Sequence, residues 1–352
     1  MRIWAEINTA ALQHNLSRVR ELAPRSKVVA MVKTNAYGHG LLQCASILQN
    51  ADYLGVATLD EAIAIRIHGI KTPVLLMPGF QSEKELQLIE EYNIDSVVYD
   101  PFQLALLAKA SKTINVWLKL ETGMHRLGFA PEVAVASIEQ ALGLAHVNVV
   151  ALMTHFASAD SPDPTKTEEQ VQAFKAIVDQ FDIPLSVSNS SAILRYPGLD
   201  SDFIRPGIML YGVSPLINGQ ASDHNILPVM TLKASIMRLM DLKPGESVGY
   251  GSEWMAMRPS KVAVISAGYG DGYPRRPQGV MALVNGYTVP VIGRASMDYL
   301  TIDVTDVPVV ELQDAVTLWG EGLAIETLVA TIGASSYALL SDLSMRVPRI
   351  LR

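Results

Sequence analysis

Eight short apolar runs, each followed by a segment of helical periodicity, constrain this chain more than any other feature of its sequence. The runs lack regular polar alternation, which is typical of parallel strands buried on both faces. The segments between them repeat apolar residues three and four positions apart, as helices that cover a sheet do. The predicted strands are 27–33, 53–57, 73–77, 96–100, 114–120, 147–156, 184–189 and 203–210. Eight strand–helix repeats in about 200 residues predict an α/β fold that begins with a closed (β/α)₈, TIM-like barrel.

Beyond about residue 215 the pattern changes to β-rich segments separated by PG, NG and GDG turns. This pattern predicts a second, mostly antiparallel β-domain. We expect the barrel to span residues 9–228 and the β-domain to span 229–352, with an N-terminal strand at 1–8 that belongs to the β-domain. The helix after that strand has two candidate N-caps, Asn8 and Thr9.

Composition excludes several classes of protein. The chain has 352 residues, 49% of them hydrophobic and 18% charged, and a net charge of -7, which argues against nucleic-acid binding. No apolar run approaches the roughly 20 residues of a membrane span, and MRIWAEIN does not resemble a signal peptide. The single cysteine, Cys44, excludes an internal disulfide and a cysteine-ligated metal, and we expect it to be buried and inert. These features predict a cytoplasmic protein with no metal site and no membrane or nucleic-acid partner.

Unusual polar residues lie near or just after the ends of four predicted strands and, in the case of Arg205, within a fifth. They are Lys33, Arg126, His155, Asn189 with Ser190, and Arg205. Each has a structural explanation when taken alone: a lysine that reaches solvent, an arginine that pairs with Glu121, a satisfied core histidine. The carboxyl ends of barrel strands carry the active sites of such folds. Polar residues from five strands at that one rim therefore favour a functional site.

Arg205 lies inside the apolar run FIRPGIML. A guanidinium stays charged in proteins, so burial requires an acceptor or a ligand beside it. The backbone N–H groups of Gly207 and Ile208, with the hydroxyl of Ser190, offer an anion site where barrels commonly hold phosphate. A lysine, a phosphate cradle and a buried arginine together indicate pyridoxal 5'-phosphate held as a Schiff base on Lys33.

Seven motifs carry a resemblance to a known family over residues 1 to about 350. They are MVKTNAYGHG, LETGMHRLGF, THFASAD, RPGIMLYGVSP, VGYGSEW, GYGDGYPR and GRASMD. In this order they resemble the pyridoxal phosphate-dependent alanine racemases. The resemblance implies interconversion of L- and D-alanine through an external aldimine by two bases, which supplies D-alanine for peptidoglycan. It also implies a homodimer with shared active sites.

The resemblance assigns roles to residues at the matching positions. Lys33 would form the internal aldimine and act as the base on one face, and Tyr250 of the partner subunit would be the base on the other. His155 would lie behind Tyr250 in a network that reaches Arg205. The implied cofactor contacts are Lys33, Tyr37, Ser190, Arg205, Gly207 and Ile208, and the implied substrate contacts are Arg126 and Met297.

Further positions have supporting roles by the same resemblance. The implied entrance residues are Tyr269, Asp160, Arg275 and Arg294. Lys119 matches a position that is often carbamylated, which would give Arg126 an anionic partner. Family members often have a tyrosine just before the C-terminal RVPR, where this chain has Met345. One phosphate contact must therefore come from elsewhere or be absent.

Three other classes of protein share part of this pattern. A racemase with broader specificity, for serine or basic amino acids, stays open. A decarboxylase of similar domain plan usually brings a C-terminal cysteine to its site, and this chain has none beyond Cys44. A non-catalytic cofactor-binding protein would be a single barrel and would not need the β-domain.

Overall fold

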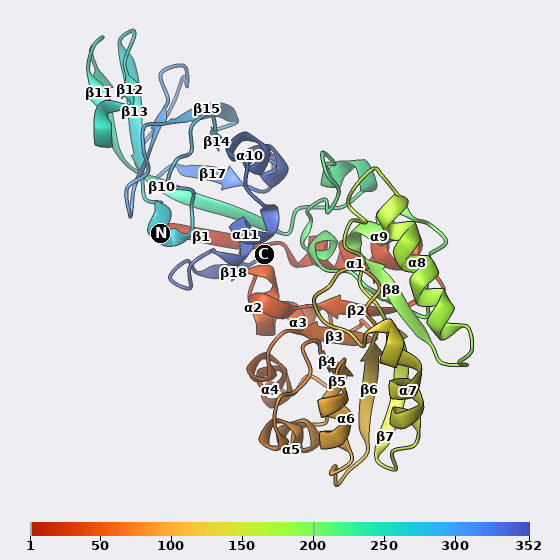
Figure 1. The fold of residues 1–352 in the computed structure, drawn as a ribbon. Coiled ribbons are helices and arrows are strands. Elements are labelled where there is room, and N and C mark those ends of the chain that lie inside the picture. Colours follow the sequence, from red (N-terminus) through yellow and green to blue (C-terminus); the bar gives the residue numbers. More distant parts are fainter. Residues whose placement is uncertain (1, 200) are drawn as a thin grey trace.

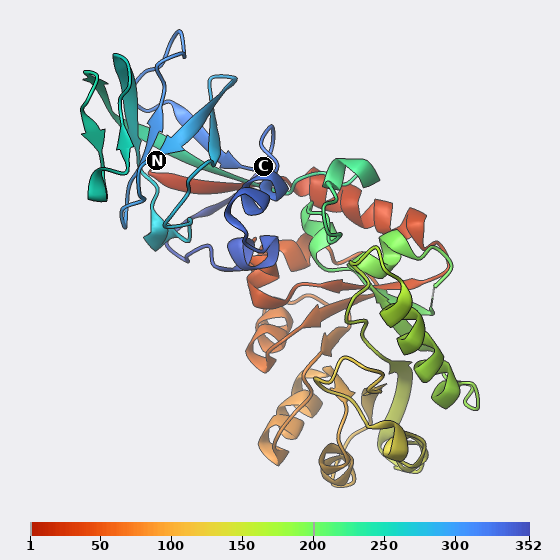
Figure 2. The same ribbon diagram turned by 45° about the horizontal axis from the view of Figure 1, so that its top comes forward.

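The computed structural model describes residues 2–199 and 201–352 and shows a barrel joined to a β-domain (Figures 1 and 2). Eight parallel strands close the barrel in chain order: β2 (Lys27–Met31), β3 (Tyr53–Val56), β4 (Val74–Leu76), β5 (Asp95–Val98), β6 (Ile114–Lys119), β7 (Val147–Met153), β8 (Leu185–Asn189) and β9 (Phe203–Arg205). Each overlaps one predicted strand, so the predicted fold class is confirmed. Their apolar side chains are almost all buried, as expected of strands covered on both faces.

Helices alternate with the barrel strands, and the longer ones cover the outside of the barrel (Figure 1). They are α1 (Thr9–Leu22), α2 (Lys33–Tyr37), α3 (Leu41–Ile47), α4 (Leu59–Ile67), α5 (Glu83–Tyr92), α6 (Pro101–Leu107), α7 (Pro131–Leu142), α8 (Thr165–Val178) and α9 (Ser190–Arg195), with short 3₁₀ turns η1 (Ile208–Tyr211) and η2 (Ala221–His224). Side-chain caps set several helix starts: Asn8 accepts from the N–H of Ala11 for α1, and Ser82 accepts from Glu85 for α5. Of the two candidate caps of α1, Asn8 is the one used.

The second unit is a mostly antiparallel β-domain. Its elements are β1 (Ile3–Ile7), β10 (Met230–Leu242), β11 (Ser247–Val248), η3 (Tyr250–Ser252), β12 (Trp254–Met255), β13 (Ser260–Ile265), η4 (Tyr269–Asp271), β14 (Met281–Val284), β15 (Tyr287–Ile292), β16 (Leu300–Asp303), β17 (Ala315–Trp319), α10 (Ile325–Ile332), α11 (Ser336–Ser341) and β18 (Arg349–Leu351). Strand β1 pairs antiparallel with β10 and parallel with β18. The two ends of the chain are therefore neighbours in one sheet.

Each predicted strand extends at least one residue beyond the observed strand, and three of these differences concern site residues. The last, predicted over 203–210, ends at Arg205 because Pro206 cannot donate to a ladder and the chain then enters η1. The first ends at Met31, two residues before Lys33, and the sixth ends at Met153, two residues before His155. The polar side chains thus lie in the loops just beyond the strands.

Contacts between α2 and the C-terminal segment join the two units. The guanidinium of Arg349 donates to the carbonyl of Gly38 at 2.9 Å. A Cβ on Gly38 would lie 2.0 Å from the carbonyl oxygen of Leu340, so only glycine permits this approach. The exact domain limits at 228 and 229 stay a prediction. Within the described residues, no helix is both long and apolar enough to cross a membrane.

Candidate active site

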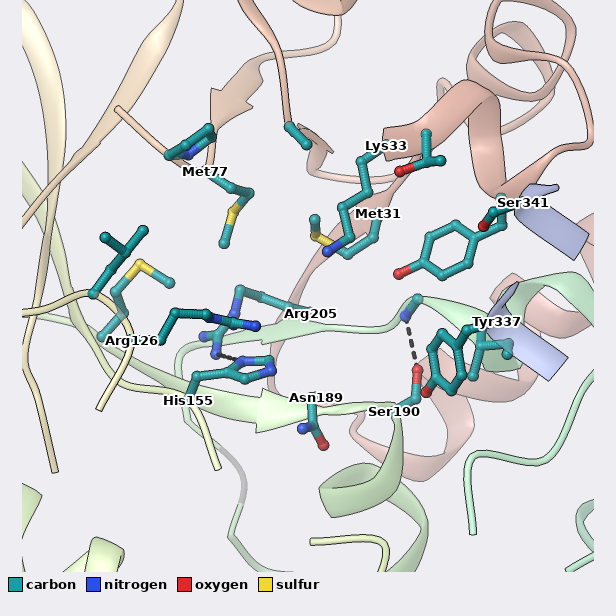
Figure 3. A pocket seen from close by; sticks show the side chains of 18 of the residues that line it. Met31, Lys33, Met77, Arg126, His155, Asn189, Ser190, Arg205, Tyr337 and Ser341 are labelled. Carbon is teal, nitrogen blue, oxygen red and sulfur yellow. Dashed lines mark hydrogen bonds between the residues drawn. The ribbon is translucent and has the colours of Figure 1, made fainter. Parts of the chain in front are cut away.

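A cavity of about 440 Å³ opens at the carboxyl ends of the barrel strands (Figure 3). Nine of the predicted site residues line it: Lys33, Tyr37, Lys119, Arg126, His155, Ser190, Arg205, Gly207 and Ile208. They come from five different strands or the loops that follow them. Tyr337 and Ser341 of α11 complete the lining from the β-domain. The volume is in the range of small-molecule sites.

Lys33 begins a turn of unusual backbone conformation. The next four residues, 34–37, all have positive φ, between 52° and 55°, and none is glycine. Such a left-handed turn costs about 1–2 kcal/mol per residue, so neighbours must hold it. The carboxylate of Glu61 accepts from the N–H of Asn35 at 3.1 Å and from that of Ala57 at 3.0 Å. The turn directs both Lys33 and Tyr37 into the cavity.

The electrostatic surroundings of Lys33 favour its neutral form. Burial and the nearby charge of Arg126 lower the pKa of Lys33, and the charge of Glu61 opposes them. A lysine of lowered pKa has more free amine near neutral pH, which is the nucleophilic form. Lys33 is therefore suited to attack a carbonyl.

Arg205 lies at the floor of the cavity and is 3% exposed. It donates to the carbonyl of Thr154 at 2.6 Å, to that of Val187 at 3.3 Å and to Nδ1 of His155 at 3.3 Å. Burial lowers the pKa of Arg205 to about 10, and burial with the charge of Arg205 holds the pKa of His155 well below its ordinary value. Since a guanidinium can only donate, the neutral imidazole accepts at Nδ1 and carries its proton on Nε2.

An anion cradle lies at the β8 and β9 side of the cavity. The N–H of Gly207 donates to the hydroxyl oxygen of Ser190 at 2.8 Å. A Cβ on Gly207 would lie 2.4 Å from the hydroxyl of Tyr37, so glycine leaves that hydroxyl free to face the cavity. Burial raises the pKa of Tyr37, which therefore remains a hydrogen-bond donor at neutral pH.

Tyr337 is a cavity residue that the sequence did not reveal. Its ring lies 6.2 Å from that of Tyr37, on the same side of the cavity as Ser190 (Figure 3). Met345, in contrast, is 80% exposed and does not line the cavity; its sulfur accepts from the side chain of Asn35 at 3.7 Å. The extra hydroxyl near the anion cradle thus belongs to Tyr337, eight residues before Met345. No sequence motif pointed to Tyr337.

Arg126 and Lys119 are the cations on the opposite side. The carboxylate of Glu121 accepts from backbone N–H groups of its own loop, including Met124 at 2.7 Å, and makes no ion pair with the side chain of Arg126. Lys119 is 6% exposed, and burial, then Arg126 and Arg205, lower its pKa to about 8. This side of the cavity is suited to a carboxylate.

Six predicted site residues do not line this cavity, and five of them gather on one face of the β-domain. The guanidinium of Arg294 lies beside Gly251, next to Tyr250, and the N–H of Ala295 donates to the carbonyl of Arg275. The guanidinium of Arg275 lies over the ring of Tyr269, 5.8 Å from its centroid. The face is formed by Tyr250, Tyr269, Arg275, Arg294 and Met297. We call it the β-domain face.

Exposure separates the β-domain face from the cavity. Tyr250 is 69% exposed, Met297 54% and Tyr269 39%. Asp160, the sixth residue, lies in the loop after β7, where its carbonyl accepts from Arg195 at 3.3 Å. Exposed apolar side chains gathered in this way are typical of a surface that meets another molecule.

The fold is a parallel barrel joined to an antiparallel β-domain, and its site places a lysine and a buried arginine at the carboxyl rim of the barrel. Together they define an enzyme that works on a small carboxylate. A family model described as the N-terminal domain of alanine racemase matches residues 7–215, and one described as its C-terminal domain matches 229–351. The chain belongs to the alanine racemase family, whose members are isomerases.

Relatives and solved structures agree with this assignment. The alanine racemase of Shewanella sediminis (strain HAW-EB3) is 44% identical over 347 residues, which cover 97% of each chain. The crystal structure of the biosynthetic alanine racemase from Pseudomonas aeruginosa is 37% identical with a TM-score of 0.95, covering 100% of this chain and 99% of that one. The alanine racemase from Acinetobacter baumannii is 39% identical with a TM-score of 0.95, covering 100% of both.

Proposed function

We propose that this protein interconverts L- and D-alanine with pyridoxal 5'-phosphate in the cavity, as a homodimer whose active sites are shared. The observation that carries the proposal is the placement of Lys33 between an anion cradle and a carboxylate-binding side formed by Arg126. Supply of D-alanine for peptidoglycan in the cytoplasm is the role that the family resemblance implies.

The residues of the cavity fit the proposed cofactor. Gly207 leaves open the space that a Cβ would fill beside the Tyr37 hydroxyl, and a phosphate needs such a space among donors. Tyr37, Ser190 and the N–H groups of Gly207 and Ile208 would hold the phosphate, and the amine of Lys33 would hold the aldehyde. When bound, the cofactor supplies a conjugated ring that acidifies the α-hydrogen of the amino acid.

Arg205 is the residue that would face the ring nitrogen of the cofactor. A carboxylate at that place would share a proton with a ring nitrogen, whereas a guanidinium can only donate. Arg205 is held by the carbonyls of Thr154 and Val187, so it has no freedom to move away. An arginine at that position would leave the ring nitrogen unprotonated, so the cofactor would be a weaker electron sink and transamination would be suppressed.

Racemisation requires a proton to leave one face of the α-carbon and another to arrive on the opposite face, so two bases must lie on either side. Lys33 supplies one. Tyr250 of the partner subunit is proposed as the other, and its exposure on the β-domain face, outside the cavity of its own chain, supports this role. Arg126 and the backbone of Met297 bind the substrate carboxylate, and Tyr269, Arg275 and Arg294 form the entrance with Asp160.

Lys119 stays a predicted site of carbamylation. With its pKa lowered to about 8, a sizeable fraction of the amine is neutral near pH 7.5, and the neutral amine is the form that adds to carbon dioxide. The resulting carbamate would place an anion beside Arg126 and Arg205, the two cations that most affect Lys119.

A chiral assay of the purified protein with L-alanine, L-serine and L-lysine, with and without added pyridoxal phosphate, tests the proposal. We expect D-alanine from L-alanine, and activity that falls when the cofactor is removed. Equal or faster conversion of serine or lysine would favour the racemase of broader specificity. No racemisation of any of the three would contradict the proposal.

Tyr337→Phe is expected to weaken cofactor binding about tenfold, because it removes one hydrogen bond to a charged phosphate. Cofactor affinity is measured from the visible absorbance during titration with pyridoxal phosphate. Adding Met345→Tyr to Tyr337→Phe should not restore the affinity, since residue 345 is exposed and outside the cavity. Unchanged affinity in Tyr337→Phe would remove this tyrosine from the phosphate site.

A further inference from the structure

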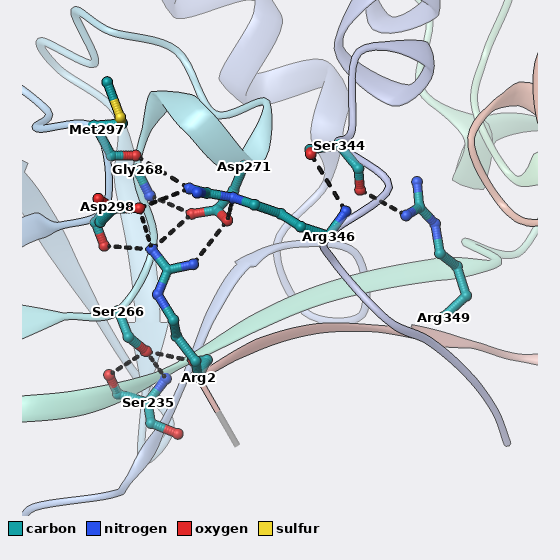
Figure 4. Close-up of polar contacts among 10 residues, drawn as sticks. All are labelled: Arg2, Ser235, Ser266, Gly268, Asp271, Met297, Asp298, Ser344, Arg346 and Arg349. Atoms are coloured by element: carbon teal, nitrogen blue, oxygen red, sulfur yellow. Dashed lines mark hydrogen bonds and ion pairs between the residues drawn. The ribbon is translucent and has the colours of Figure 1, made fainter.

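Asp271 is a completely buried carboxylate outside the cavity, with four hydrogen bonds around it (Figure 4). Arg2 donates to it at 2.9 and 3.2 Å, Nε of Arg346 at 2.7 Å, and the N–H of Gly268 at 2.9 Å. Burying an ionised carboxylate is costly unless such partners pair it. Nothing in the proposed reaction uses this group, so its role must be sought elsewhere.

The same two arginines also bind a second acidic residue, Asp298. Arg2 donates to its carbonyl at 2.8 Å and to its carboxylate at 3.2 Å. Arg346 donates to its carboxylate at 2.9 Å. Each guanidinium therefore bridges Asp271 and Asp298 with its planar fork, a geometry that lysine cannot reproduce. We call Arg2, Asp271, Asp298 and Arg346 the bridging cluster.

The bridging cluster lies directly beneath two residues of the β-domain face. Asp271 ends η4, the turn that begins with Tyr269, and Asp298 follows Met297. The carbonyl of Met297 accepts from the N–H of Gly270 at 2.9 Å and from Arg346 at 3.4 Å. A Cβ on Gly268 would lie 2.4 Å from that carbonyl oxygen, so the two segments are in direct contact. The cluster thus sets how these segments lie against each other.

We infer that the bridging cluster positions Tyr269 and the backbone of Met297 for use in the partner subunit's active site. The inference rests on the proposed function and deepens it. Asp271, Asp298, Arg2 and Arg346 are positioning residues, because they act through Tyr269 and Met297 and do not line the cavity.

In the alternative explanation, the bridging cluster acts on the active site of its own subunit. The segment that carries Arg346 begins at Ser341, which lines the cavity of the same subunit. Loss of Arg346 would then disturb that subunit's own Tyr337 and Ser341. The two explanations predict different results when mutant and normal subunits are combined.

Arg346→Met keeps an unbranched side chain as far as the position of Nε and removes the guanidinium fork. In the homodimer we expect the KM for L-alanine to rise about tenfold with kcat within about twofold, because binding shared by ground and transition states is lost. The visible absorbance with pyridoxal phosphate should stay normal, since Lys33 and the anion cradle belong to the barrel. Arg346→Lys should give an intermediate KM.

Hybrid dimers separate the two explanations. An Arg346→Met subunit is co-expressed with a Lys33→Ala subunit, and the hybrid is purified through two different tags. Its one competent site combines the barrel of the Arg346→Met subunit with a normal β-domain face from the other subunit. We expect a wild-type KM. A KM that stays raised would mean that Arg346 acts within its own chain and would overturn the inference.

Two further variants complete the experiment. Arg258→Met, the matched control, removes an ion pair with Asp306 in the same domain, and its KM should be unchanged. Asp298→Asn keeps its shape and should raise KM about threefold, which tests the inference if Arg346→Met fails to fold. An inactive wild-type protein would overturn the proposed function as well. An active wild type with unchanged KM in Arg346→Met and Asp298→Asn would overturn the inference alone.

Discussion

Lys33→Ala should abolish racemisation and the visible absorbance that the protein acquires with pyridoxal phosphate. Lys33 is the one lysine that both lines the cavity and begins the left-handed turn aimed into it. In the proposed function Lys33 both holds the aldehyde and serves as a base. Removal of a base alone lowers rates by about 10²–10⁴-fold. We therefore expect a loss of at least about 10³-fold. Activity is followed by chiral chromatography and cofactor binding by absorbance.

Lys27→Ala is the matched control for Lys33→Ala. Lys27 begins the same strand, β2, at its opposite end, where its ammonium lies 5.4 Å from the ring centroid of Phe203. Its loss removes a lysine and a cation–π contact but leaves the cavity intact. Activity and absorbance should be those of the wild type. Full activity in Lys33→Ala would rule out the proposed chemistry.

Tyr250→Phe should slow removal of the α-proton from L-alanine far more than from D-alanine. The substitution deletes a hydroxyl and keeps the ring, so the face served by Lys33 keeps its base. We expect about a 10²–10⁴-fold loss on the L side, the usual contribution of a general base. Washout of α-deuterium from each enantiomer into water measures the two faces separately. An equal, small loss for both enantiomers would contradict the assignment of opposed bases.

Controls for Tyr250→Phe use a distant tyrosine and a hybrid. Tyr287→Phe removes another exposed tyrosine hydroxyl of the β-domain, 47% exposed on β15, and should leave both washout rates unchanged. A hybrid of Lys33→Ala and Tyr250→Phe subunits contains one site with both bases intact. It should regain up to about half of the wild-type activity. An inactive hybrid would show that Tyr250 does not act in the partner's site.

The barrel could be predicted well from the sequence because the residue pattern of each strand and helix depends on its local environment. A parallel strand buried on both faces must be apolar along its length, and a helix that covers it must be apolar on one stripe, so both patterns are visible without knowing the neighbours. The error at 203–210 has the same origin. Residues after Arg205 are apolar and fully buried, as a strand would be, yet Pro206 and the turn η1 divert the chain.

The backbone at Lys33 was beyond prediction from sequence. Four consecutive non-glycine residues with positive φ have no recognisable signal, because each residue alone prefers another conformation. Only contacts with distant groups make the turn stable, among them the carboxylate of Glu61 and the carbonyl of Leu340 packed on Gly38. Tyr337 was missed for the same reason. It lies 300 residues beyond Tyr37 in the chain, and only α11 packing on α2 brings the two rings together.

The sequence by itself determined the fold class and the residue types that chemistry requires: a lysine, a buried arginine and an anion cradle at strand ends. The tertiary structure decided how these residues are grouped. It gathered nine into one cavity and left five on an exposed β-domain face, next to the buried carboxylate of Asp271. The physical reason is the separation along the chain of the residues that interact. Hydrophobic periodicity depends on near neighbours, whereas the site forms by packing between segments that are up to hundreds of residues apart.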